Sequence, residues 1–217
     1  GTGVSQAAAE RGMKVSMHAV NHWERAIETH AHNHPEARHY CTGVDALDPC
    51  ETIRGGRVDL LWASPECTHH SDARGGRPRS NQSRASAWCI LKWLVDLYVP
   101  RVIIENVAAF LKWGPLDENG KRIKEREGEI FKAWVGALRS LGYRVDWRIL
   151  NAADYGAPQS RERLFIQAVR DTRRIVWPSP SHAEIPKGQR LPWLGAREVI
   201  DWRDPGRSIF GRKKPLC

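Results

Sequence analysis

The chain alternates short apolar runs with stretches of helical periodicity, and this alternation constrains its fold more than any other feature. Runs of strand length cover residues 14–20, 58–63, 101–105, 143–150 and 164–169, and helical patterns cover residues 23–33, 85–98 and 129–141. Strands separated by helices predict an α/β protein with a mostly parallel sheet covered by helices on both faces. In such sheets, ligands gather at the carboxyl ends of the strands.

Composition narrows the class of protein. Of 217 residues, 41% are hydrophobic and 27% are charged, which excludes general disorder and indicates one substantial domain. The net charge of +9 favours a polyanionic partner. No apolar run approaches the roughly 20 residues that cross a bilayer, and the five cysteines form no C-x-x-C pair. We therefore expect a cytoplasmic protein with reduced thiols and no membrane contact.

Both ends of the sequence look interrupted. Gly1-Thr2-Gly3 precedes an alanine-rich helical stretch over residues 5–11, as at the end of a glycine-rich strand-to-helix turn, but no strand precedes it. Residues 211–217 stop without a helix cap or a polar tail. We expect a fragment truncated at both ends, whose sheet lacks its first strand.

A cysteine just beyond an apolar run is the first candidate for chemistry. Cys67 stands in Pro65-Glu66-Cys67, after residues 58–63, in a polar loop that would expose its thiol. A free thiol is only a few per cent thiolate at neutral pH, so a nucleophilic cysteine needs cationic neighbours. Arginines are abundant nearby. By contrast, Cys41, Cys50 and Cys89 are expected to be small buried hydrophobic side chains.

Two further polar motifs accompany strands. Glu105-Asn106 ends the run over residues 101–105, so Glu105 can face the same crevice as Cys67, although a solvated strand end is an equal alternative. The other motif precedes residues 164–169. In extended structure, its Gln159, Arg161 and Arg163 side chains point to one side and suit phosphate and base-edge contacts, with an ordinary exposed edge as the alternative.

Together and in this order, the three motifs resemble those of the cytosine-C5 DNA methyltransferase family, of bacterial or phage type. The family pattern is Pro-x-Cys, then Glu-Asn-Val, then Gln-x-Arg-x-Arg, which stand here at residues 65–67, 105–107 and 159–163. Further matches lie at residues 33–35, 43–45 and 152–156. The resemblance implies a Rossmann-like, S-adenosylmethionine-dependent catalytic core over residues 1–170. Residues 171–217 would form an irregular segment that leads toward an absent target-recognition region.

The resemblance also implies a reaction, the transfer of a methyl group from S-adenosylmethionine to C5 of a cytosine in double-stranded DNA, as in restriction-modification. Cys67 would attack C6 of a base that has left the duplex, because C6 cannot be reached inside the stack. Glu105 would hold N3 and the 4-amino group while charge develops on the ring. Asn106 would steady that loop.

Three more positions follow from the Gln-x-Arg-x-Arg block. Arg163 resembles the arginine that reaches the base and the neighbourhood of Cys67, while Gln159 and Arg161 resemble the members that position the backbone. These roles come from the resemblance and not from the spacing alone.

The family also binds its cofactor with a glycine-rich turn and with acids after the second and at the third strand. Gly1 and Gly3 match the turn, Pro65 joins the pocket, and Asp45 matches the third position, where it would approach the adenine. Asn21 departs from the pattern, because an acid normally stands there and takes the ribose hydroxyls. An amide still accepts one hydrogen bond, so we expect altered rather than abolished binding.

Glu66 is a second departure, since many members have proline at this position. Its negative charge beside the thiol would oppose ionisation and leave the arginines to compensate. Residues 71–84 contain glycine, serine and four arginines and predict a flexible basic lid that closes on DNA, with a disordered surface loop as the alternative. These arginines are Arg74, Arg77, Arg79 and Arg84.

Other patterns are interpreted as structural. His30, His32 and His34 do not share a helical face, so no metal site is expected. Trp88, Trp93 and Trp134 lie at helical positions and are expected in the core. Two alternatives stay open: a tRNA-methylating enzyme with the same core, and a fragment that binds DNA without turnover.

Overall fold

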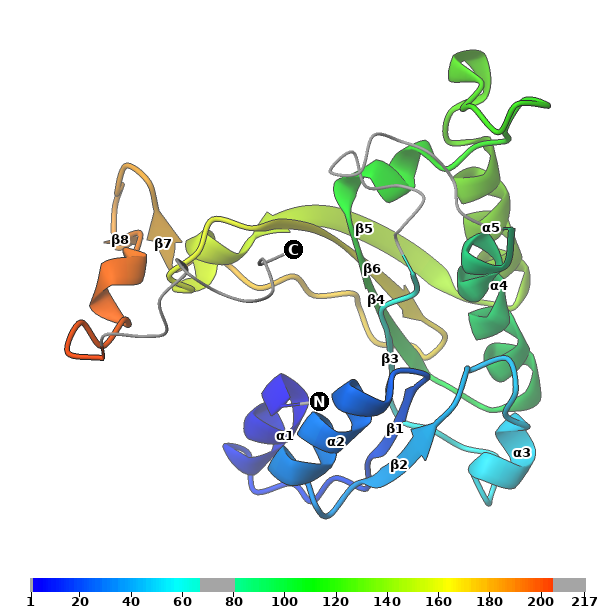
Figure 1. Cartoon of the computed structure of the whole chain (residues 1–217), viewed down its shortest axis with the longest axis horizontal. Coiled ribbons are helices and arrows are strands. Elements are labelled where there is room, and N and C mark those ends of the chain that lie inside the picture. The colour runs from blue at the N-terminus through cyan, green and yellow to red at the C-terminus, as the bar shows by residue number, and fades with distance from the viewer. Residues whose placement is uncertain (1, 67–80, 205–217) are drawn as a thin grey trace, which may run out of the picture. The chain divides into compact units, whose positions relative to one another are not determined.

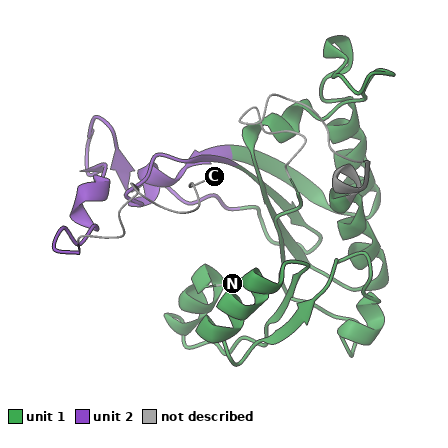
Figure 2. Cartoon of the chain, in the orientation of Figure 1, with its two compact units in different colours: residues 1–148, 164–175 green, residues 149–163, 176–217 purple. Residues whose placement is uncertain are grey.

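The computed structural model describes residues 2–66 and 81–204 (Figure 1). These residues form two compact units (Figure 2). Unit 1 contains residues 1–148 and 164–175, and unit 2 contains residues 149–163 and 176–217. None of the described helices is both long and apolar enough to span a membrane.

A two-stranded parallel sheet lies near the N-terminus of unit 1. Strand β1 (His18–Asn21) pairs with β2 (Arg38–Cys41) from His18↔Arg38 to Asn21↔Cys41. Helix α2 (Glu24–Asn33) connects the two strands, and α1 (Thr2–Ala9) precedes them. The expected strand over residues 14–20 is shorter in the structure and begins at His18, because Met13 and Val15 lie exposed to solvent instead of in a sheet.

A four-stranded sheet has the order β3-β4-β6-β5. Its strands are β3 (Leu61–Ala63), β4 (Arg101–Asn106), β5 (Arg144–Asn151) and β6 (Glu162–Val169). Strand β3 pairs in parallel with β4, whereas β6 runs antiparallel to β4. The short connection between β5 and β6 explains why β6 is not parallel to β4. Parallel neighbours need a long crossover, but between β5 and β6 the chain forms only the short helix η4 (Ala152–Tyr155).

Helices α4 (Asn81–Asp96) and α5 (Glu129–Ser140) lie beside this sheet (Figure 1). Unit 1 also contains the short helices α3 (Pro49–Thr52), η2 (Ala108–Lys112) and η3 (Lys124–Arg126). Helix α5 buries four side chains at helical spacing: Phe131, Trp134, Val135 and Leu138. It ends as the sequence predicts, because Gly142 adopts a φ of 87° that favours glycine.

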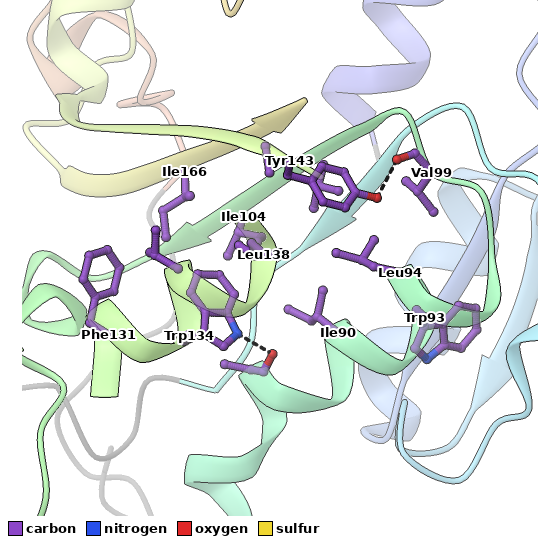
Figure 3. Close-up of a cluster of buried hydrophobic side chains, with 14 of the residues drawn as sticks. Ile90, Trp93, Leu94, Val99, Ile104, Phe131, Trp134, Leu138, Tyr143 and Ile166 are labelled. Carbon is purple, nitrogen blue, oxygen red and sulfur yellow. Dashed lines mark hydrogen bonds between the residues drawn. The ribbon is translucent and has the colours of Figure 1, made fainter. Parts of the chain in front are cut away.

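Two polar atoms inside the core find backbone partners (Figure 3). The Trp134 side chain is 0% exposed, and its Nε1–H donates to the Ala87 carbonyl at 3.0 Å. The Tyr143 hydroxyl donates to the Val99 carbonyl at 2.6 Å. The first bond joins α5 to α4, and the second joins the residue before β5 to the segment that follows α4. The two helices are therefore joined to each other, and the segments that lead into β4 and β5 are joined to each other, by more than apolar contact.

The cysteines and tryptophans only partly follow expectation. Cys41 and Cys50 are exposed, so the prediction of buried thiols was wrong for both, whereas Cys89 is half-buried. Cys50 follows the buried Pro49 at the start of α3, and its Sγ–H donates to the Asp96 carbonyl. Trp93 and Trp134 are buried as expected, but Trp88 is partly exposed on α4.

Unit 2 is built mainly from turns. Besides η4 it contains β7 (His182–Ala183), β8 (Leu191–Pro192) and η5 (Ala196–Glu198). Strand β7 pairs in parallel with β8, with His182 opposite Leu191.

The Tyr143 contact generates a prediction about stability. Changing Tyr143 to Phe leaves the buried Val99 carbonyl without its donor, so we expect a loss of about 1–3 kcal/mol in the free energy of unfolding. Urea denaturation followed by circular dichroism measures it. Tyr98→Phe is the matched control, because Tyr98 is 41% exposed and its ring contacts with Arg57 and Arg170 survive the change. Equal losses in both variants would contradict the role of the buried bond.

Candidate active site

Several predicted site residues lie outside the described part of the chain. Gly1, Cys67 and the loop arginines Arg74, Arg77 and Arg79 belong to this group. The backbone at Arg84 is described and differs from expectation, because α4 begins at Asn81 and places Arg84 in a helix rather than in a flexible loop. Backbone hydrogen bonding from Asn81 onward accounts for the difference.

A buried amide joins the ends of two neighbouring parallel strands. Asn106, the last residue of β4, is 2% exposed. Its Nδ2–H donates to the Pro65 carbonyl at 3.2 Å, and its Oδ1 accepts from the Val107 N–H at 2.9 Å. Pro65 follows β3 closely, and Cys67 comes two residues later. Asn106 therefore fixes the backbone that leads to Cys67, while its role in a reaction stays a prediction.

Glu66, between Pro65 and Cys67, has two partners. Its backbone N–H donates to Ser86 Oγ at 3.1 Å, which ties the segment to α4. Its carboxylate lies 4.0 Å from Nε2 of His22, which follows β1. Both side chains are well exposed, so this contact adds at most about 1 kcal/mol. The contact instead shows that the carboxyl ends of β1 and β3 lie close together.

Glu105 lies on the half-exposed face of the four-stranded sheet. Burial alternates along β4, so Val102 and Ile104 face the core and Glu105 faces the other way. In register, Glu105 is opposite Phe165 on β6. The Phe165 ring packs edge-on against Trp62 of β3, with centroids 6.4 Å apart. The face around Glu105 is thus aromatic and partly open, and a carboxylate there avoids the cost of burial in the core.

The Gln-x-Arg-x-Arg residues begin in a bent loop of unit 2. The chain bends at Pro158 and Gln159, and β6 starts only at Glu162, so Gln159 and Arg163 do not share one extended segment as the sequence analysis expected. Proline at 158 and the closure of the preceding turn account for the bend. Gln159 and Arg161 are exposed, whereas Arg163 is half-buried and shares a strand face with Phe165.

Besides Pro65, three positions expected at the cofactor are described. Asn21 ends β1, and its Oδ1 accepts from the Trp23 N–H at 2.8 Å. Asp45 follows β2, and a Cβ at Gly43 would collide with its Oδ1, so a larger residue at 43 would displace the carboxylate. Gly3 lies within α1 rather than in a turn, since the helix already begins at Thr2.

The surroundings of Asp45 also bear on Cys89. Burial raises the pKa of the Cys89 thiol, and the Asp45 carboxylate raises it further. Both effects oppose thiolate formation, so Cys89 is unsuited to act as a nucleophile. The loop that carries Asp45 is anchored on α4, where Trp93 Nε1–H donates to the Val44 carbonyl at 3.2 Å.

Sequence reasoning missed three residues near these strand ends. Trp23 is 63% exposed at the start of α2, and its position two residues after a strand was a usable signal. His22 and Ser86 contact Glu66 from other elements, and nothing in their local sequence indicates this. Within residues 2–66 and 81–204, no group of three His, Cys, Asp or Glu side chains is placed to hold a metal ion.

The Asn106 contacts predict that a charge at this position lowers stability in a pH-dependent way. In Asn106→Asp, a carboxylate oxygen would face the Pro65 carbonyl with no proton to donate, so we expect a loss of about 2 kcal/mol or more at neutral pH. Burial raises the pKa of such a carboxyl. Stability should therefore recover as the pH falls through that raised value, because the protonated group donates again.

Thermal melts between pH 5 and 8 measure this effect. Asn119→Asp, in an exposed turn, is the control and should melt like the parent protein throughout. An Asn106→Asp variant that is as stable as the parent protein at pH 8 would contradict the contact.

Known proteins resemble the chain in sequence. The model of the family described as C-5 cytosine-specific DNA methylase matches residues 1–200. The Type II methyltransferase M.AgeI of Thalassovita gelatinovora is 30% identical over 173 residues, which cover 77% of this chain and 37% of that relative. M.SacI of Streptomyces achromogenes is 25% identical over 217 residues, covering 92% of this chain and 53% of the relative. The chain thus spans well under two thirds of these relatives.

Solved structures agree at the level of the fold. A mutant of Spodoptera frugiperda DNMT2 matches with a TM-score of 0.60 at 21% identity, covering 88% of this chain and 54% of that one. The S. pombe Dnmt2 methyltransferase matches with a TM-score of 0.54 at 18% identity, covering 80% and 47%. The α/β fold is accordingly that of the S-adenosylmethionine-dependent methyltransferases, and the match over residues 1–200 shows that the chain belongs to the C-5 cytosine-specific DNA methylase family.

Proposed function

We propose that the protein transfers a methyl group from S-adenosylmethionine to C5 of cytosine in DNA, through a covalent adduct between Cys67 and C6 of a flipped base. The observation that carries this proposal is the Asn106 contact with Pro65. It joins the segment before Cys67 to the strand end that carries Glu105, so two motifs distant in sequence meet at adjacent strand ends. Membership of the family supports the same reaction.

The residues at the strand ends fit the cofactor. The His22–Glu66 contact brings together the carboxyl ends of β1 and β3, the edge at which ligands bind in such sheets. Trp23 offers an exposed aromatic face, on which a planar ring such as adenine can stack. Asn21 and Asp45 would contribute polar contacts nearby. When bound, S-adenosylmethionine supplies an electrophilic methyl group.

The chain's own residues would prepare the cytosine. The Cys67 thiolate adds to C6, and the electron pair of the C5–C6 double bond makes C5 nucleophilic. Glu105 holds N3 and the 4-amino group, which stabilises the charge that develops on the ring. Once C5 carries the methyl group, loss of the C5 proton returns an electron pair to the ring, the C5–C6 double bond re-forms, and the Cys67 thiolate leaves. The base must be outside the duplex throughout.

Arginine side chains would hold the DNA. Arg163 would approach the base, and Arg161 and Gln159, both exposed, would contact the backbone. The loop arginines after Cys67 would neutralise phosphates, which makes binding strongly salt-dependent.

The proposed covalent step predicts that a modified substrate forms a stable adduct with the protein. A duplex with 5-fluorocytosine at the target cannot lose a proton from C5, so the full-length protein should remain bonded to it through Cys67. Denaturing electrophoresis detects the adduct, which Cys67→Ser should abolish while folding and cofactor affinity persist. Cys50→Ser, at an exposed cysteine on α3, is the matched control and should trap normally. An adduct that persists in Cys67→Ser would refute the assignment.

The role of Glu105 predicts a separate effect on turnover. Glu105→Gln keeps the shape of the side chain but removes its charge, so we expect kcat to fall about 10²–10⁴-fold. Cofactor affinity, from calorimetric titration, should stay unchanged. Glu118→Gln, at an exposed turn, is the control. A kcat within twofold of the parent value in Glu105→Gln would contradict the proposed contact with the base.

A further inference from the structure

We propose that residues 176–193 act as a brace that fixes the loop of residues 151–161 for DNA binding, with Trp193 and His182 as positioning residues. The inference deepens the proposed function, on which it rests, because Gln159 and Arg161 of this loop are the side chains assigned there to the DNA backbone. All of the contacts that carry it lie within unit 2.

The base of the loop is closed by one side chain. Asn151 Oδ1 accepts from the Ala153 N–H at 3.1 Å and from the Arg161 N–H at 3.0 Å. Its Nδ2–H donates to Ser160 Oγ at 3.1 Å, and the Ala152 N–H donates to the Arg161 carbonyl at 3.0 Å. Both arms of the loop therefore meet at Asn151, so the backbone that carries Arg161 is anchored at its base.

The helix η4, which follows Asn151 in the loop, is held from outside by the brace. Trp193 Nε1–H donates to Asp154 Oδ1 at 2.9 Å, and the Ser181 N–H donates to the Asp154 carbonyl at 3.0 Å. The Tyr155 hydroxyl donates to the Pro178 carbonyl at 3.4 Å. Asp154 is thus fixed through both its side chain and its backbone, by residues up to 39 positions later in the sequence.

A glycine of the loop also lies close to a histidine of the brace. Gly156 adopts a φ of 84°, and a Cβ there would lie 2.9 Å from Cε1 of His182. The His182 ring is placed by β7, since the Leu191 N–H donates to the Ser181 carbonyl and the Trp193 N–H to the Ala183 carbonyl. His182 Nδ1 also lies 2.9 Å from Ser181 Oγ. The turn at Gly156 is therefore confined by its own conformation and by the imidazole.

This arrangement explains how a loop whose only regular element is the short helix η4 can present exposed contact groups. A flexible loop must be ordered when it binds, which lowers affinity, whereas a pre-ordered loop avoids that loss. The brace would order the loop in advance and so raise affinity for DNA. It would leave the chemistry at the flipped base and the binding of the cofactor untouched, because the contacts described above do not involve those residues.

Trp193→Phe tests the proposal in the full-length protein. The change keeps an aromatic ring but removes the donor to Asp154, so we expect the Kd for a fluorescein-labelled duplex to rise about three- to tenfold. The KM for DNA should rise similarly, with kcat within twofold and calorimetric affinity for S-adenosylmethionine unchanged. Trp202→Phe is the matched control. It removes a similar bond, from a 71% exposed indole to the Arg197 carbonyl, but it does not touch the loop.

A second pair of variants tests the approach of His182. Gly156→Ala places a methyl group against the imidazole and should weaken DNA binding about as much as Trp193→Phe. Gly188→Ala is its control, because Gly188 has a φ of 65° but a methyl group added there would meet nothing within 4 Å. Asp154→Asn keeps an acceptor oxygen for Trp193 and should retain near-parental affinity, whereas Asp154→Ala should not.

The readouts separate the brace from the reaction. Anisotropy measures DNA affinity without turnover, so a protein that binds DNA but never methylates cytosine would refute the proposed function alone, and the ratio of Kd values would still decide the brace. Unchanged Kd in both Trp193→Phe and Gly156→Ala would overturn the brace. Equal loss of DNA affinity, cofactor affinity and melting temperature would also overturn it, because that pattern indicates a merely structural role.

Discussion

The buried side chain of Asn106 is the contact on which the candidate site depends. An amide at 2% exposure must satisfy both its donor and its acceptor, and here it does so with Pro65 and Val107. Because β3 and β4 run in parallel, their carboxyl ends are neighbours, and the amide converts that proximity into a fixed distance. Glu66 is fixed in turn by Ser86 of α4. The segment before Cys67 is thus anchored to a strand and to a helix.

The two units stabilise their functional residues by different means. In unit 1, a core around Trp134 holds α4 and α5 against the sheet, so residues at the strand ends gain their positions from the packing behind them. The described part of unit 2 contains little apolar core, and its exposed residues include Val176, Ile185 and Leu191. Its loop is instead held by hydrogen bonds and by the close approach of Gly156 to His182. Hydrogen bonds need a donor and an acceptor in particular directions, so such a network is sensitive to single substitutions.

Periodicity predicted most of the fold, because local patterns govern it. The four buried residues of α5 recur at helical spacing, and Gly142 ends that helix where a glycine was expected. Predictions failed for the exposure of Cys41 and Cys50, which depends on the tertiary structure, and at two boundaries of local structure, the start of α4 at Asn81 and the bend at Gln159. The order of the motifs identified the family. The bond between Trp193 and Asp154 joins residues 39 positions apart, and no local sequence pattern predicts it.

The identity of the methylated atom tests the account most directly. Duplex DNA would be incubated with the full-length protein and S-adenosylmethionine that carries an isotopically labelled methyl group, then digested to nucleosides for mass spectrometry. The label should appear in 5-methylcytosine alone, since attack at C6 activates only C5. A parallel incubation with tRNA should stay unlabelled. Label in N4-methylcytosine or N6-methyladenine, or in tRNA and not in DNA, would contradict the account.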